Sequence, residues 1–132
     1  MDKSLQLVVI TPTKTIFNEK IYSVLLNSVE GEMVVRPGHT SVTCALKYGI
    51  SKFTISEGNE RKATIMGGFA EITGTKVTIL TDAAEWPEDI DASRATEAQS
   101  RAKTRLAEKG DGLDIGRAEA ALARAAARLE LK

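Results

Sequence analysis

The pattern of hydrophobic and polar residues changes once along the chain, between residues 82 and 89. Before that segment, apolar and polar residues alternate in short runs, which is the period-two pattern of half-buried strands. The runs predict strands over residues 5–10, 14–17, 21–28, 33–35, 41–46, 49–56, 61–66, 69–73 and 77–80. Glycine-containing pairs such as Tyr48-Gly49 and Gly67-Gly68 are read as breaks between strands. Short strands at this spacing are typical of an antiparallel sandwich or flattened barrel.

The last third of the chain contains a repeated helical sequence. Residues 90–106 and 113–129 align with an offset of 23, and eight of the 17 aligned positions are identical. In both copies the apolar residues recur every three or four positions, so they share one helix face. The arginines keep the same spacing in each copy and form a stripe beside that face. The link at residues 109–112 is short and contains two glycines, so we expect antiparallel neighbouring helices.

These patterns predict an α+β protein with two parts. An all-β sandwich is expected over residues 1–84, a linker over 85–89 and a helical hairpin over 90–132. The facing sides of the two helices are mostly alanine, which buries little apolar area at roughly 25 cal/mol per Å². Six of the eight arginines also lie after residue 84. We therefore expect a hairpin that opens easily, and that an anionic ligand bridging both helices would stabilise.

Composition and charge exclude several classes of function. The 132 residues carry no formal net charge, which argues against bulk nucleic-acid binding. No stretch is long and apolar enough to span a bilayer, and the residues after Met1 lead straight into a strand, so we expect no signal peptide. Cys44 is the only cysteine, which excludes an intrachain disulfide and fits a reducing compartment. His39 is the only histidine, so neither a catalytic triad nor a histidine-containing metal site is expected.

The charged residues of the hairpin have two interpretations. Asp91 either interacts only with the start of its helix, or it accepts a hydrogen bond from the amino group of a base. The arginines of the stripe either form a solvated charged face, or Arg101, Arg124 and Arg128 hold a polyphosphate. Spacing alone does not decide between these interpretations.

A series of ordered motifs resembles the epsilon subunits of bacterial F-type ATP synthases over nearly the whole chain. The motifs are Thr11-Pro12, Gly31-Glu32, Pro37-Gly38-His39, Gly67-Gly68-Phe69-Ala70-Glu71, Val77-Thr78-Ile79-Leu80, Ala83-Ala84-Glu85 and the two helical copies. The chain departs from that family at Met33-Val34-Val35-Arg36, where Leu-Gly-Ile-Leu is more usual, and at Trp86-Pro87 in the linker. The number of ordered motifs argues against an unrelated β-sandwich binding module with a helical tail.

The resemblance implies a non-catalytic subunit of the rotor. In such a subunit the sandwich docks on the gamma subunit and the c-ring, and couples rotation to ATP synthesis. The hairpin permits turnover when it is folded on the sandwich. It blocks ATP hydrolysis when it extends along gamma and contacts the beta and alpha subunits. The implied location is the cytoplasmic face of the bacterial cell membrane, as a peripheral protein.

The resemblance also implies an ATP site in the folded hairpin. Some family members bind ATP through a motif that this chain has as Ile90-Asp91-Ala92-Ser93-Arg94-Ala95. By this resemblance, adenine and ribose would be surrounded by Glu85, Ile90, Asp91, Arg94 and Ala95, and the phosphates held by Arg101, Arg124 and Arg128. The resemblance allows a Mg²⁺ ion bound to the phosphates, although the sequence contains no dedicated ligand for it. The second copy, Leu113 to Ala118, fits the short motif as well, so the motif does not identify the binding copy. The alternative is a hairpin without ligand, whose arginines only contact the catalytic hexamer.

Overall fold

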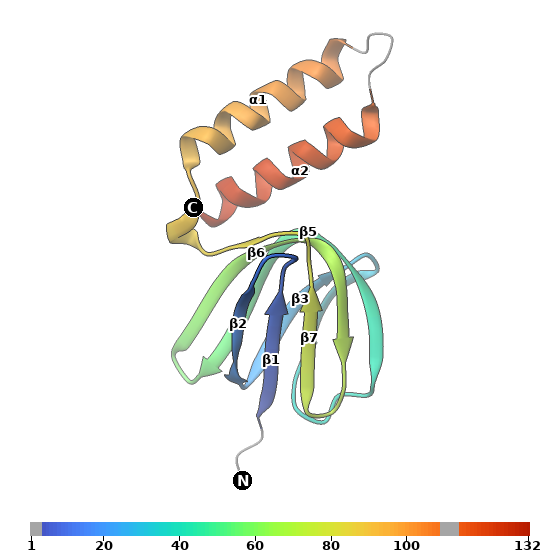
Figure 1. The fold of residues 1–132 in the computed structure, drawn as a ribbon, viewed down its shortest axis with the longest axis vertical. Helices are drawn as coiled ribbons and strands as arrows, with labels where there is room; N and C mark the ends of the chain where they lie inside the picture. Colours follow the sequence, from blue (N-terminus) through green and yellow to red (C-terminus); the bar gives the residue numbers. More distant parts are fainter. Residues whose placement is uncertain (1–3, 109–113) are drawn as a thin grey trace.

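The computed structural model describes residues 4–108 and 114–132, so the predicted turn at 109–112 lies outside the described residues. The elements are β1 (Leu5–Ile10), β2 (Thr15–Ile21), β3 (Ser23–Ser28), β4 (Gly31–Val35), β5 (Val42–Ser56), β6 (Asn59–Ile72), β7 (Lys76–Leu80), β8 (Ala84–Glu85), the 3-10 turn η1 (Pro87–Asp89), α1 (Ala92–Glu108) and α2 (Ile115–Leu131). The helices lie together above one end of the β part (Figure 1). The predicted fold class, a β-sandwich followed by a helical hairpin, is confirmed.

The strands form one sheet that folds over to enclose a hydrophobic core. The strand order is β2-β1-β7-β6-β5-β3-β4, with the short β8 paired to β6. Alternate residues point inward, so Leu7 of β1, Val24 of β3, Phe53 of β5 and Ile79 of β7 meet in the same buried cluster. Figure 1 shows β1, β2 and β7 in front of β3 and β5.

The predicted breaks at Tyr48-Gly49 and Gly67-Gly68 are wrong, because β5 and β6 run through them as continuous strands. These glycines mark close approaches instead of turns. A Cβ atom on Gly49 would lie 2.9 Å from Nδ2 of Asn27. Gly68 has a φ of +100°, and a Cβ atom there would overlap the carbonyl of Leu80, at 1.9 Å from its oxygen.

The Gly67-Gly68 segment is where β6 changes its neighbour. Residues 69–72 pair with β7, whereas Thr64 and Ile65 pair with β8. Beyond Leu80 the chain therefore continues along the same edge of β6, passes Gly68 at close range, and pairs with β6 again as β8. This path brings the residues that follow β8 to the end of the sandwich below the helices.

One strand pair differs from the antiparallel pattern that the sequence indicates. β1 pairs with β7 in parallel, from Gln6 opposite Lys76 to Ile10 opposite Leu80. Period-two alternation is the same in parallel and antiparallel strands, so it cannot reveal this pairing.

The helices pack as an antiparallel hairpin through small side chains, as predicted. The buried helical residues are Ala95, Ala102, Ala118, Ala125 and Ala127. α2 lies between α1 and the sandwich and packs on β5 and β6 (Figure 1). Ile115, which the repeat assigns to the apolar face, is instead half exposed at the first turn of α2.

Both helical copies start with the same capping contact. Asp91 Oδ1 accepts a hydrogen bond from the backbone N–H of Arg94 at 3.1 Å, and Asp114 Oδ1 accepts one from Arg117 N–H at 3.0 Å. A carboxylate at this position satisfies a free N–H group and favours the positive end of the helix dipole. The matched aspartates of the repeat therefore have a structural role in each copy.

Candidate functional site

A cavity of about 470 Å³ lies where the linker, the start of α1 and the end of α2 meet. Its lining consists of Glu85, Asp89, Asp91, Arg94, Ala95, Ala98, Arg101 and Arg128. Six of the eight sequence-predicted ligand residues are in this lining. Since the predicted set comes from three separate segments, their convergence depends on the tertiary fold.

Local structure explains why these side chains converge. Asp91 caps α1, and positions 94, 95, 98 and 101 then follow at the three- and four-residue steps of one helix face. Arg128 lies in the last turn of α2, and in an antiparallel hairpin that turn lies beside the start of α1. Glu85 is held at the end of β8, where its N–H donates to Thr64 Oγ1 at 3.1 Å.

The cavity contains three arginines and three carboxylates. Arg128 and Glu85 form a half-buried ion pair across the cavity wall, with 2.5 Å between Nε and Oε1. Arg94 and Arg101 are exposed on α1. A phosphate chain entering this space would meet the two exposed guanidinium groups directly, but it would have to share Arg128 with Glu85.

Two residues of the predicted set lie outside the lining. Ile90 is 3% exposed and is not part of the lining. Arg124 lies over the ring of Tyr48 on β5, with its Cζ atom 5.6 Å from the ring centroid. A phosphate-binding role for Arg124 stays a prediction, and it requires this side chain to leave Tyr48.

Sequence reasoning missed Asp89 and Ala98 in the lining, and Tyr48 as the partner of Arg124. The sequence could have indicated Ala98, because it shares the helix face of Ala95 and is repeated as Ala121. For Asp89 the only indication was its position next to the motif. Nothing in the sequence connects Tyr48 with a helix that begins more than sixty residues later.

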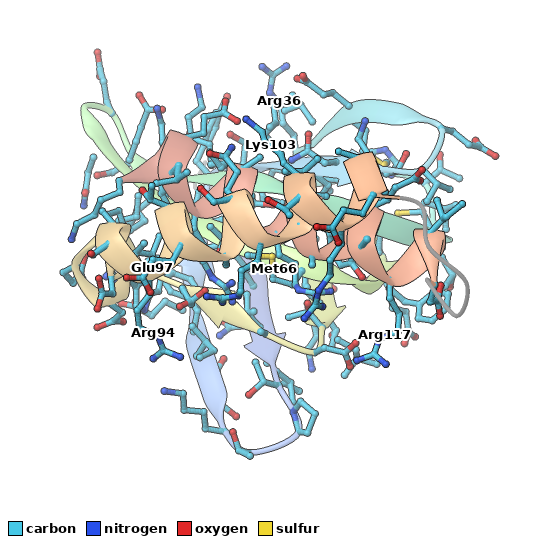
Figure 2. All side chains as sticks on the ribbon, turned by 90° about the horizontal axis from the view of Figure 1, so that it is seen from above. Arg36, Met66, Arg94, Glu97, Lys103 and Arg117 are labelled. Atoms are coloured by element: carbon cyan, nitrogen blue, oxygen red, sulfur yellow. The ribbon has the colours of Figure 1, made fainter. Side chains whose placement is uncertain are left out.

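The structure brings the first motif copy, and not the second, to the cavity. Asp114 and Arg117 of the second copy are exposed. Figure 2 shows Arg117 at the opposite end of the hairpin from Arg94. Among the described residues of the two copies, those of the first lie beside the linker, and there residues of both helices and the linker face one space.

The size and donor set of the cavity suit an organic anion better than a bare metal ion. Its volume lies within the range of about 300–1,000 Å³ that is usual for small-molecule sites. Among residues 4–108 and 114–132, no three histidine, cysteine, aspartate or glutamate side chains cluster in a way that could hold a metal ion. An accompanying Mg²⁺ would therefore depend on phosphate oxygens for most of its ligands.

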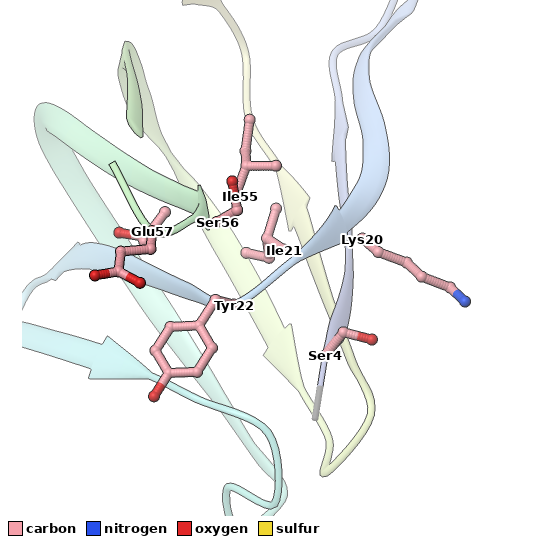
Figure 3. Close-up of a pocket in the computed structure, with 8 residues that line it drawn as sticks. Ser4, Lys20, Ile21, Tyr22, Ile55, Ser56 and Glu57 are labelled. Carbon is pink, nitrogen blue, oxygen red and sulfur yellow. The ribbon is translucent and has the colours of Figure 1, made fainter. Parts of the chain in front are cut away.

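Three other hollows in the described part of the chain have no arginine in their lining. A larger one, of about 750 Å³, lies at the end of the sandwich away from the hairpin and is lined by residues such as Ile21, Tyr22 and Ile55 (Figure 3). Its one lysine, Lys20, points away from the other labelled side chains (Figure 3).

Cys44 is half-buried with its Sγ 3.8 Å from Met33 Sδ, and burial raises the pKa of its thiol.

A further hollow follows the outer face of the sheet at β6 and β7. Phe69 and Leu80, which are opposite each other in the ladder, are 57% and 48% exposed there. Large apolar side chains gathered on an exposed sheet face are typical of protein interfaces. In the described part of the chain, no helix is long and apolar enough to cross a membrane.

Comparison with known families accounts for the whole described chain. Residues 4–87 match the β-sandwich domain of the ATP synthase delta/epsilon chain, and residues 88–132 match its long α-helix domain. The ATP synthase epsilon chain of Clostridium kluyveri is 38% identical over 99% of this chain and 98% of its own length. That of Nitratidesulfovibrio vulgaris is 41% identical over 100% and 98%. A chain of the Euglena gracilis mitochondrial ATP synthase, solved with OSCP, F1 and the c-ring, superposes with a TM-score of 0.86 at 26% identity, covering 98% of this chain and 81% of that one.

Proposed function

The chain belongs to the ATP synthase delta/epsilon family, and from this premise we propose that its helical hairpin is a regulator whose folded state is stabilised by ATP. As an epsilon chain it is a non-catalytic subunit of the central stalk of ATP synthase, peripheral to the membrane complex. The regulatory role is the part that goes beyond family membership. It combines ATP binding when the hairpin is folded with inhibition of ATP hydrolysis when it extends.

The observation that carries the proposal is the convergence of three segments on one charged cavity. Glu85 comes from the linker, Asp91 and Arg101 from the first copy, and Arg128 from the end of α2. A ligand that contacts all three segments can bind only while the hairpin is folded. Such a ligand stabilises the folded state by about 2.7 kcal/mol at a hundredfold excess over its dissociation constant.

The charges favour a nucleotide polyphosphate with its base toward the linker. The carboxylates of Glu85, Asp89 and Asp91 lie at the linker end, and they suit the amino group of adenine and the ribose hydroxyls. Arg101 lies nearly three turns beyond Asp91 along α1 and, with Arg128, would take the phosphates. Arg124 would join them from α2, and Mg²⁺ would be held mainly by the phosphates.

The partners proposed for the assembled enzyme follow the two parts of the fold. The exposed apolar side chains Phe69 and Leu80 support docking of the sandwich, with gamma and the c-ring as its proposed partners. The extended hairpin would contact the beta and alpha subunits. No nucleic acid is proposed as a partner, in keeping with the zero net charge. The proposed location is the cytoplasmic face of the bacterial membrane.

The second candidate function is a hairpin that inhibits without sensing a ligand. Two contacts favour it: Arg128 already pairs with Glu85, and Arg124 already lies on Tyr48. In this alternative the arginines stabilise the folded hairpin themselves and exchange to acidic surfaces of the hexamer when it extends.

Calorimetric titration of the full chain with ATP, with and without Mg²⁺, separates the two functions. The proposal expects saturable one-to-one binding of ATP and much weaker binding of adenosine, which lacks the phosphates. GTP serves as the control for the base. No heat of binding at ATP concentrations up to the millimolar range would leave the ligand-free alternative.

A further inference from the structure

The linker residue Trp86 packs on the sandwich, and we propose that it is a positioning residue for the candidate ATP site. It would hold residues 84–90 as a fixed part of the sandwich, so that the hairpin swings from the start of α1 and not from the linker. This inference rests on the proposed function for its effect on ATP. The placement of the hinge can be tested without any nucleotide.

Trp86 completes an aromatic cluster at the edge of the core. Its ring centroid lies 6.0 Å from that of Phe17 and 5.9 Å from that of Phe53, with the second pair edge to face. Phe17 and Phe53 are themselves 5.3 Å apart and buried. Such pairs each contribute roughly 0.5–1.5 kcal/mol beyond the burial of area. All of these partners belong to strands of the sandwich, and none belongs to a helix.

Arg61 of β6 lies over the ring of the tryptophan. Its guanidinium Cζ lies 3.8 Å from the ring centroid, within the range of a cation–π contact. The same guanidinium lies 3.9 Å from Oε1 of Glu88, two residues further along the linker. This second contact is exposed and weak by itself. Through these two contacts, the side chain of Arg61 holds Trp86 and Glu88, the residues before and after Pro87.

The backbone of the segment is fixed as well. β8 pairs with β6 at Ala84 and Glu85, and Thr64 Oγ1 accepts from the N–H of Glu85. In the 3-10 turn, the N–H of Asp89 donates to Trp86 O at 3.0 Å, and that of Ile90 donates to Pro87 O at 3.3 Å. Ile90 is buried. Asp91 is exposed, so it is the first residue past these anchors.

This arrangement divides the cavity into a fixed wall and a movable one. Glu85 and Asp89 belong to the anchored segment, whereas Arg94, Arg101 and Arg128 belong to the helices. A ligand that arrives at a folded hairpin would then find the linker residues already in place. If Trp86 were removed, the linker would have to be ordered during binding, and affinity would fall by roughly tenfold.

Hydrogen exchange of the full chain tests the hinge without nucleotide. We expect the amides of Glu85, Asp89 and Ile90 to be protected in the original chain, and to lose protection in Trp86→Ala but keep it in Trp86→Phe. Arg128→Ala, which frees α2 from Glu85, should leave them protected. Unprotected amides in the original chain, or loss of protection in Arg128→Ala, would show that the hairpin and not Trp86 holds the linker, and would overturn the inference.

ATP titration of the same variants tests the positioning role. Trp86→Ala should bind ATP roughly tenfold more weakly, and Trp86→Phe should restore most of the affinity. Ile72→Val is the matched control, because Ile72 is buried in the same core but pairs with Val77, away from β8 and the linker, and it should leave ATP affinity unchanged. Equal losses in Ile72→Val and Trp86→Ala would mean that Trp86 acts only through the stability of the core. If the original chain does not bind ATP, the proposed function fails, while the exchange experiment still decides where the hinge lies.

Discussion

Arg128 has two possible partners in the folded molecule. Its side chain pairs with Glu85, and it also lines the cavity where phosphates would bind. The Glu85–Arg128 pair is half-buried, so Arg128 is already partly desolvated, but giving it to a phosphate obliges the Glu85 carboxylate to take another donor such as a ribose hydroxyl. Arg124 has the same duality in weaker form, since a cation–π contact at 5.6 Å is easily released.

Alanine substitutions of the cavity arginines should weaken ATP binding selectively. Each charge-assisted contact contributes roughly 1.5–3 kcal/mol, so Arg101→Ala and Arg128→Ala should each lower ATP affinity about 10- to 150-fold. Arg124→Ala should act similarly only if Arg124 leaves Tyr48. Calorimetry with ATP and adenosine measures the effect, and Arg105→Ala and Arg117→Ala are the controls. Equal losses at all five arginines would indicate diffuse electrostatics and no defined site.

Asp91→Asn should narrow the preference for ATP over GTP. A carboxylate accepts a hydrogen bond from the amino group of adenine but repels the carbonyl oxygen that guanine has there. Asparagine keeps the helix cap that Asp91 makes to Arg94, so the start of α1 should not change. Competition between ATP and GTP for the site measures the ratio of their two affinities. Asp114→Asn, the equivalent change in the second copy, is the control, and an unchanged ratio in Asp91→Asn would leave that residue as a cap only.

Gly68→Ala should strongly destabilise the sandwich. The added methyl would collide with the backbone of Leu80, and the residue would be held at a positive φ, so we expect a loss of more than about 3 kcal/mol. Gly58→Ala has a similar positive φ but open space around it, so it should cost only about 1 kcal/mol. Urea denaturation followed by circular dichroism compares the two. Similar losses would mean that the backbone of Leu80 and Thr81 beside Gly68 relaxes easily.

Elements with a strong periodic pattern were predictable, and those created by tertiary contacts were not. α1 and α2 were predicted within two residues of their observed bounds, because the repeat shows its period twice. β8 and the 3-10 turn were read as linker, since their order comes from Trp86 packing on Phe17 and Phe53. The same limit applies at the site. The motif predicted the residues of α1, but no periodicity reveals that Arg124 lies against Tyr48.

A chain that ends at residue 90 should be more stable than one that ends at residue 84. We expect both to fold, because the buried core belongs to strands β1 to β7. The shorter chain lacks Trp86 and exposes Phe17 and Phe53, which should cost about 2 kcal/mol and lower the melting temperature by about 8–16 °C. Differential scanning calorimetry checks this. An unfolded chain in both cases would contradict an independent β domain, and equal melting temperatures would deny Trp86 a part in its stability.

At the scale of the whole molecule, the hairpin should respond to ATP in the assembled enzyme. The alanine seam makes the folded hairpin marginal, so a bias of ~1 kcal/mol toward the extended state is within reach of about 2.7 kcal/mol of ligand stabilisation. A fluorescence pair on Lys103 and the sandwich should then report a short distance at high ATP and a long one at low ATP.

Deleting the residues after Asp89 should relieve inhibition of ATP hydrolysis in the same enzyme. The deletion removes the whole hairpin and Ile90 but leaves β8 paired with β6, so assembly with gamma should persist. Hydrolysis rates at low ATP measure the effect, with the complete subunit as control. If the deletion activates the enzyme while the distance between the fluorophores does not change with ATP concentration, the hairpin inhibits hydrolysis without responding to ATP.

The parallel pairing of β1 with β7 has a consequence for how the protein is made. Ile10 is paired with Leu80, so one edge of the first strand stays unpaired until a segment 70 residues further along the chain has been translated. At about 5–20 residues per second, that delay is roughly 4–14 s on the ribosome. During this time β2 can cover one edge of β1, but the other edge exposes unpaired backbone beside Leu7 and Val9. The nascent chain is therefore most exposed to aggregation, and most in need of a chaperone, before β7 emerges.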